Sequence, residues 1–240
     1  MAVAARAPVN SPRSLLRRRP AIEAVTFDVG GTLITPAPSV GAIYARVASR
    51  HGVPGLGAEL LDRRFKEVWA KSRPFQHGRD DWSRLVDRVF EGLAPEPPSR
   101  TFFPALYAEF GRADAWRVFD DVVPTIEALA GIGVDLGIIS NWDDRLRPLL
   151  RDLRLDRYFN SILISCETGF AKPSPVIYQE ALRRLGRPAA AVLHVGDELQ
   201  DDFAGATTAG FSALHLRRET PPADLQIQSL REVAARLGAV

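Results

Sequence analysis

Beyond residue 119 the chain alternates short, fully apolar segments with longer segments whose apolar residues repeat at helical spacing. The short segments predict strands and the longer ones predict helices. Strands that are apolar on both faces are typical of a parallel sheet covered by helices on both sides. The predicted strands are 134–139, 161–164, 191–195 and 212–216, and the predicted helices are 123–130, 145–153, 175–185, 201–209 and one near 230–237.

A first strand is predicted at residues 24–27, which are rich in residues that favour β structure. From residue 38 to about 115, apolar residues recur only at helical spacing, with breaks rich in Pro and Gly. We therefore expect a doubly wound parallel-sheet (Rossmann-like) α/β core domain formed by residues 21–37 and 116–240. An all-helical cap domain is expected at 38–115, and a disordered or targeting tail at 1–20.

The distribution of charge argues against a nucleic-acid partner. Five of the 31 basic residues lie in the first 20 residues, which contain no acid, so the rest of the chain holds 26 basic against 29 acidic groups. A body with this balance lacks the basic surface that phosphate backbones attract. No apolar stretch approaches the roughly 18 residues of a membrane span, so no membrane association is expected either.

The single cysteine, Cys166, excludes an internal disulfide and is expected to be a small buried residue in a reducing compartment. A cytoplasmic location follows most simply. The Arg-rich, acid-free start leaves a second location open, a plastid or mitochondrion, if residues 1–20 are a transit peptide.

Polar side chains follow several of the predicted strands. Asp28 follows the first strand, Ser140 and Asn141 follow the next, and Asp197 follows the strand at 191–195. Because ligands bind beyond the carboxyl ends of strands in open α/β sheets, these side chains are expected to converge there with Lys172. Carboxylates are ligands for Mg²⁺, and a lysine with short polar donors suits phosphate. The sequence therefore predicts a site for Mg²⁺ and a phosphorylated ligand.

These residues belong to four ordered motifs that resemble those of the haloacid dehalogenase superfamily. The motifs are 27–33 (FDVGGTL), 139–141 (ISN), 172–175 (KPSP) and 194–197 (HVGD), the last with Asp202 five residues beyond Asp197. The resemblance runs over about residues 22–216, and the helical insert lies where the C1 cap of subfamily IA belongs. Within the superfamily the chain most resembles the rhythmically-expressed-gene-2-like group.

The resemblance implies a Mg²⁺-dependent phosphatase of a small phosphorylated metabolite. In such an enzyme Asp28 would attack phosphorus and form an aspartyl-phosphate. Mg²⁺ would lie against the Asp28 carboxylate, the Gly30 carbonyl and Asp197, supported by Asp202, which would also orient Lys172. The groups expected to bind the phosphoryl oxygens are Ser140, Asn141, Thr32 and Lys172.

The first motif departs from the family at Gly30, where a second aspartate usually acts as acid and base. General acid–base catalysis typically contributes about 10²–10⁴-fold, so alkyl phosphates are expected to be poor substrates. Three alternatives follow. The substrate could have a good leaving group, such as an acyl or aryl phosphate. A cap residue could supply the proton, with His77, Glu67 and Asp81 as candidates. Or the protein could be catalytically impaired and act as a phospho-ligand-binding or regulatory protein.

Other residues carry weaker expectations. Gly196–Asp197 argues against carbon–halogen cleavage, because the dehalogenases of the superfamily work without Mg²⁺ and lack this pair. His194 is expected to pack in a buried strand, and the segment that contains His77 is expected to be a solvated loop. Trp142 could either wall the substrate pocket or serve packing. Restoring the acid by Gly30→Asp is expected to raise activity on alkyl phosphates at least tenfold.

Overall fold

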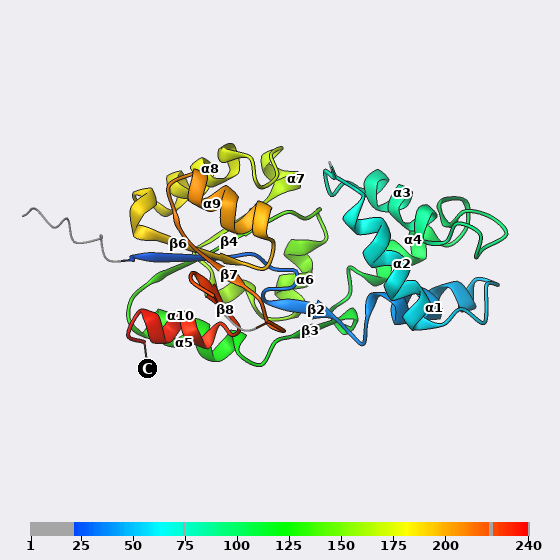
Figure 1. The fold of residues 1–240 in the computed structure, drawn as a ribbon, viewed down its shortest axis with the longest axis horizontal. Coiled ribbons are helices and arrows are strands. Elements are labelled where there is room, and N and C mark those ends of the chain that lie inside the picture. The colour runs from blue at the N-terminus through cyan, green and yellow to red at the C-terminus, as the bar shows by residue number, and fades with distance from the viewer. Residues whose placement is uncertain (1–21, 74, 221–222, 240) are drawn as a thin grey trace, which may run out of the picture.

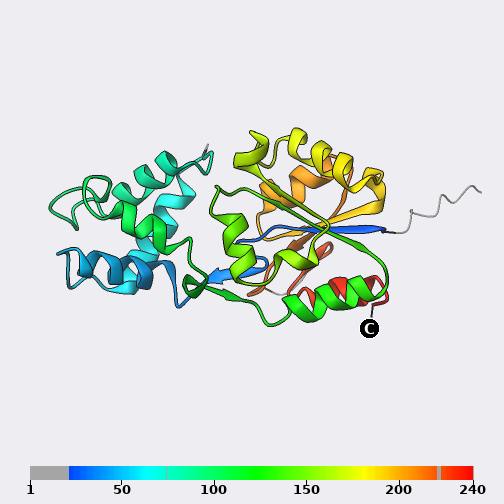
Figure 2. The same ribbon diagram turned by 180° about the vertical axis from the view of Figure 1, so that it is seen from behind.

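The computed structural model describes residues 22–73, 75–220 and 223–239, so the Arg-rich segment 1–20 lies outside them. The described residues form two bodies, an α/β core and a helical cap, that lie side by side along the long axis (Figures 1 and 2). Among them, no helix has both the length and the apolar character that crossing a membrane requires.

The core is built on a six-stranded parallel sheet in the order β5–β4–β1–β6–β7–β8. The strands are β1 (Ala24–Phe27), β4 (Asp135–Ser140), β5 (Ser161–Ile164), β6 (Val192–Gly196), β7 (Ser212–Leu216) and β8 (Gln226–Ile227). The central strand β1 is buried along its whole length and pairs with β4 on one side and β6 on the other. The chain thus switches direction across the sheet at β1, which is where α/β folds bind ligands.

Helices cover both faces of the sheet (Figure 1). One face carries α5 (Val122–Gly131), α6 (Leu146–Asp152) and α10 (Arg231–Arg236), and the other carries α8 (Pro175–Leu185) and α9 (Gly205–Thr208). The short helix α7 (Ser165–Thr168) follows β5. The doubly wound α/β fold predicted from the alternation of strands and helices is therefore confirmed.

Several details of the core were not predicted. The strand β8 has two residues, and the antiparallel pair β2 (Ile34–Pro36) and β3 (Trp116–Val118) has three in each strand, which is too short for a period to be visible. The helix predicted at 201–209 is wrong in its first half, where the π-helical turn η5 (Leu199–Ala204) precedes α9. Such turns are frequent at functional sites.

The cap consists of helices that enclose an apolar core of their own. They are α1 (Val40–Arg50), α2 (Ala58–Ala70), α3 (Arg79–Val89) and α4 (Phe103–Glu109). Short 3₁₀ turns complete the described elements of the chain: η1 (Pro98–Arg100), η2 (Ala113–Ala115), η3 (Asp156–Tyr158) and η4 (Ala189–Ala191). The β2–β3 pair joins the cap to the core at the point where the chain leaves and re-enters.

Close contact between α1 and α2 fixes the shape of the cap. A Cβ atom on Gly41 would lie 2.1 Å from the Ala58 carbonyl oxygen, so only glycine lets the two helices approach this closely. Ser39 caps α1, because its hydroxyl accepts the Ala42 N–H and donates to Asp62 on α2 at 2.6 Å.

Candidate active site

The side chains predicted from the strand ends do meet at one edge of the sheet. Asp28 follows β1, Ser140 ends β4 and Asp197 follows β6. Because β1 pairs directly with β4 and β6, the three residues lie on adjacent strands. All three, together with Lys172, line a single cavity between core and cap.

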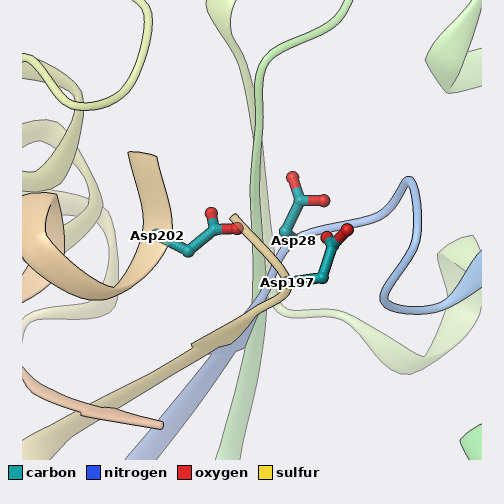
Figure 3. A group of neighbouring side chains, drawn as sticks. All are labelled: Asp28, Asp197 and Asp202. Atoms are coloured by element: carbon teal, nitrogen blue, oxygen red, sulfur yellow. The ribbon is translucent and has the colours of Figure 1, made fainter. Parts of the chain in front are cut away.

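The edge gathers three carboxylates around one lysine. One carboxylate oxygen from each of Asp28, Asp197 and Asp202 lies within 4.8 Å of the others (Figure 3). The Lys172 ammonium donates to Asp28 Oδ1 at 2.7 Å and to Asp202 Oδ1 at 2.5 Å, and its side chain is almost wholly buried. The Ser140 hydroxyl also donates to Asp28 Oδ1, at 3.0 Å, so two donors fix the orientation of the Asp28 carboxylate.

The electrostatics of this cluster follow from burial and from the excess of acid. Burial disfavours the charge on Lys172, but the carboxylates of Asp202 and Asp28 outweigh it and raise the pKa of the ammonium, which stays charged. Burial likewise opposes ionisation of Asp202, but Lys172 and His194 outweigh it and lower the pKa of that carboxyl. Asp197 lacks such a cation, and burial followed by the charges of Asp28 and Asp202 raises its pKa to about 8.

These groups fit a divalent cation. When ionised, three carboxylates face one ammonium, which leaves two negative charges without compensation, the charge that Mg²⁺ carries. All the donors are hard oxygens, as Mg²⁺ prefers. The loop of the first motif also approaches Asp197 closely, since a Cβ atom on Gly31 would lie 2.2 Å from Asp197 Oδ2. The ligand roles of Asp28, Gly30, Asp197 and Asp202 remain predictions.

Two residues predicted to bind phosphate have other contacts in this structure. The Asn141 amide accepts the Lys172 N–H at 2.7 Å and donates to the Lys172 carbonyl at 2.9 Å, so it holds the backbone from which the lysine reaches the site. Thr32 is fully buried and donates its hydroxyl to Asp197 Oδ1 at 3.1 Å. Their contact with phosphate stays a prediction, whereas their positioning of Lys172 and Asp197 is visible.

Two histidines support the cluster in ways that the sequence analysis missed. His194 is completely buried and contacts Asp202 Oδ1 at 3.2 Å through Nε2 and the Thr26 hydroxyl at 2.9 Å through Nδ1. It therefore holds Asp202 in place beside Lys172, beyond the packing role expected from its strand. His215 Nε2 contacts the Asp197 carbonyl at 2.9 Å. The sequence offers one signal for them: His194 stands within the fourth motif, and His215 lies on the neighbouring strand β7.

The position of the missing acid is covered by an aromatic ring. A Cβ atom placed on Gly30 would lie 3.1 Å from Trp142 Cζ3, tighter than most such contacts. Trp142 follows the second motif, lines the cavity and packs against Trp116 with ring centroids 5.2 Å apart. The sequence left two roles open for Trp142, and the structure shows both: its ring lines the cavity and packs against another side chain.

The three cap residues considered as proton donors differ in their position relative to the cavity. Glu67 is exposed and lies outside the cavity lining, and Asp81 pairs with Arg84 and accepts the Gln76 N–H. His77 lines the cavity, and the expectation of a solvated loop is wrong for it, since its side chain packs among Trp69, Phe75 and Trp82.

Burial and, to a lesser degree, the charges of Arg73 and Lys172 lower the pKa of His77 to about 4. Its imidazole is therefore neutral at pH 7 and cannot release the proton that a departing alkoxide needs.

One further expectation is wrong. Cys166 is exposed, because the apolar run of β5 ends at Ile164 and the chain turns into α7 at the surface.

The model of a hydrolase family described as haloacid dehalogenase-like hydrolase matches residues 22–210, most of the chain. The chain belongs to this family. The resemblance drawn from the four motifs is thereby confirmed.

Relatives and solved structures agree with this assignment. Haloacid dehalogenase-like hydrolase domain-containing protein 3 of Danio rerio is 31% identical over 232 residues, which are 89% of this chain and 95% of that protein. Glyceraldehyde 3-phosphate phosphatase of Methanopyrus kandleri is 32% identical, with 82% and 84% covered. The magnesium-bound HAD hydrolase YfnB of Bacillus subtilis has the same fold, with a TM-score of 0.74 at 21% identity over 90% of this chain and 99% of that one.

Proposed function

We propose that this haloacid dehalogenase-like hydrolase is a Mg²⁺-dependent phosphatase of a small phosphorylated metabolite. The observation that carries the proposal is the Asp28 carboxylate, held by Lys172 and Ser140 at the sheet edge and next to the carboxylates of Asp197 and Asp202. A carboxylate oriented by two donors beside a site fit for a divalent cation is suited to in-line attack on phosphorus. The relative from Methanopyrus kandleri, which is named a phosphatase of a small sugar phosphate, supports the substrate class.

Each residue has a definite part in the proposed reaction. The Asp28 carboxylate attacks phosphorus, and the bond to the leaving oxygen breaks, which gives an aspartyl-phosphate on Asp28. Lys172 remains charged throughout and stabilises the negative charge on the phosphoryl oxygens, together with the Ser140 hydroxyl. Mg²⁺, held by Asp28, the Gly30 carbonyl and Asp197, would neutralise charge on the same oxygens.

Hydrolysis of the aspartyl-phosphate then requires water, and the site lacks the usual acid/base residue for this step. Gly30 has no side chain to activate that water or to protonate the departing group. His77, the cap candidate that lines the cavity, is neutral, so it has no proton to give to the departing group. The leaving group must therefore be stable as an anion, or turnover must be slow, which keeps activity low on alkyl phosphates.

Phosphate release, with and without Mg²⁺, tests the proposal on a panel of phosphorylated metabolites that includes acyl phosphates. We expect release that requires Mg²⁺ and that falls at least 100-fold in Asp28→Asn. Asp144→Asn is the matched control, since it removes an exposed carboxylate at the same edge that does not line the cavity. Mg²⁺-dependent ligand binding without release from any substrate would refute the phosphatase and support the phospho-ligand-binding or regulatory protein instead.

A further inference from the structure

The cavity above the catalytic edge has an unusual wall. It has a volume of about 330 Å³, with Asp28, Ser140 and Lys172 at its floor. All four tryptophans of the chain line it, namely Trp69, Trp82, Trp116 and Trp142. A cavity of about 150 Å³ already accommodates benzene, so this one has room for an aromatic group attached to a phosphate.

The aromatic side chains form two separate groups around the cavity. On the cap side, Phe65, Trp69 and Trp82 stack in series, with centroids 6.1 and 5.7 Å apart and planes within 13° and 8° of parallel. On the side of the core, Trp142 packs against Trp116 of β3. A flat ring bound in this cavity would gain both burial and ring-to-ring contacts, which favour an aromatic group over an aliphatic one of equal size.

The second observation concerns the group that leaves phosphorus. Trp142 covers Gly30, so the place of the usual acid is taken by the edge of an indole ring, which supplies no carboxyl proton. A phenol has a pKa near that of tyrosine, about 10, whereas the pKa of water is about 15.7 and that of an alcohol is similar. A phenoxide can therefore depart without an acid at residue 30, and an alkoxide cannot do so readily.

We propose that the substrate is a phosphate monoester of a phenolic hydroxyl, with its ring between the two aromatic groups and its phosphate on Lys172 and Ser140; this rests on the proposed phosphatase. An Asp28 carboxylate oxygen forms a bond to phosphorus while the P–O bond to the ring breaks. The phenoxide keeps the electron pair and takes a proton from water. A second water then hydrolyses the aspartyl-phosphate, which releases phosphate and restores Asp28.

Turnover tests the proposal with substrates that separate ring recognition from leaving-group quality. With Mg²⁺, we expect kcat/KM for phenyl phosphate to exceed that for acetyl phosphate and for octyl phosphate at least tenfold. Acetyl phosphate has the better leaving group but no ring, and octyl phosphate has apolar surface but a poor leaving group. Either one matching phenyl phosphate would overturn the aromatic assignment and leave the phosphatase intact. Release from none of the three would count against the phosphatase itself.

Binding tests the cavity without turnover. Because every tryptophan lines the cavity, intrinsic fluorescence reports its occupation. We expect phenylphosphonate to bind at least tenfold more tightly than methylphosphonate, and Phe65→Ala to reduce that difference without weakening methylphosphonate. Phe170→Ala is the matched control, since Phe170 is exposed on the core and lies outside the cavity lining.

Equal affinities for the two phosphonates in the wild type, or an unchanged preference in Phe65→Ala, would overturn the proposal. If Phe65→Ala unfolds, Phe65→Leu retains the bulk, removes the ring and keeps the same expected reduction of the preference.

Discussion

Replacing Gly30 by aspartate tests how far the absent acid limits this enzyme. The possible gain in rate is large, because a general acid typically raises the rate of the chemical step about 10²–10⁴-fold, which lowers the activation barrier by about 2.7–5.4 kcal/mol. The structure shows the obstacle. The new Cβ atom would lie 3.1 Å from Trp142 Cζ3, so the indole ring must shift by a few tenths of an ångström, and overpacking of this kind costs about 1–3 kcal/mol.

The contact with Trp142 should therefore reduce the gain expected from the sequence. We expect Gly30→Asp alone to raise kcat/KM on glycerol phosphate less than it does when the indole ring is removed. In a Trp142→Leu background, which removes the ring atoms nearest residue 30, the same change should raise it at least tenfold.

A double-mutant cycle on glycerol phosphate, with melting temperatures recorded for every variant, measures this coupling. Gly30→Asn in the Trp142→Leu background is the control, since it has nearly the shape of aspartate but no acidic proton. Equal gains from Gly30→Asp in both backgrounds would refute the steric argument. A gain from Gly30→Asn as large as that from Gly30→Asp would refute proton transfer as its source.

Three further predictions concern charge and support around the site. Asp197→Asn should raise the melting temperature of the metal-free protein at pH 7 by about 2–4 °C, because folding raises the pKa of this carboxyl to about 8 and forces it to take up a proton that it lacks in the unfolded chain. It should also abolish the further rise with Mg²⁺, because it removes a ligand; thermal melts with and without Mg²⁺ check both effects. His194→Ala should lower the free energy of unfolding by about 2–4 kcal/mol in urea, since it leaves buried partners unpaired; a normal stability would contradict its support of Asp202. Asp121→Asn should cost about 2–3 kcal/mol at pH 7, because it breaks the two-fold contact with Arg218. Burial opposes ionisation of Asp121, but Arg218 and the N–H of Leu230 outweigh it and lower the pKa of this carboxyl. The cost of Asp121→Asn should therefore persist down to about pH 4 and disappear only below it. Urea unfolding at pH values from 7 to 3 measures this cost, and its disappearance well above pH 4 would contradict the reasoning.

Much of the site could be read from the sequence because its parts are local. Asp28 and Asp197 each stand directly after an apolar strand and Ser140 ends one, and parallel strands bring such positions to one edge whatever the details of packing. The helical insert was visible for the same reason, since its periodicity is a property of consecutive residues. Short elements such as β8 and the β2–β3 pair gave no such signal, because two or three residues do not define a period.

The sequence by itself determined the order of the motifs, the α/β class and the loss of the acid at Gly30. Only the tertiary structure decided what replaces that acid, because Trp142 and Gly30 are 112 residues apart and meet only when β4 pairs with β1. The same holds for the contact of His194 with Thr26, which is 168 residues away, and for the aromatic wall, whose members come from the cap, the β2–β3 pair and the core. Contacts between distant residues depend on how whole elements pack, and this packing cannot be read from the pattern of any single segment.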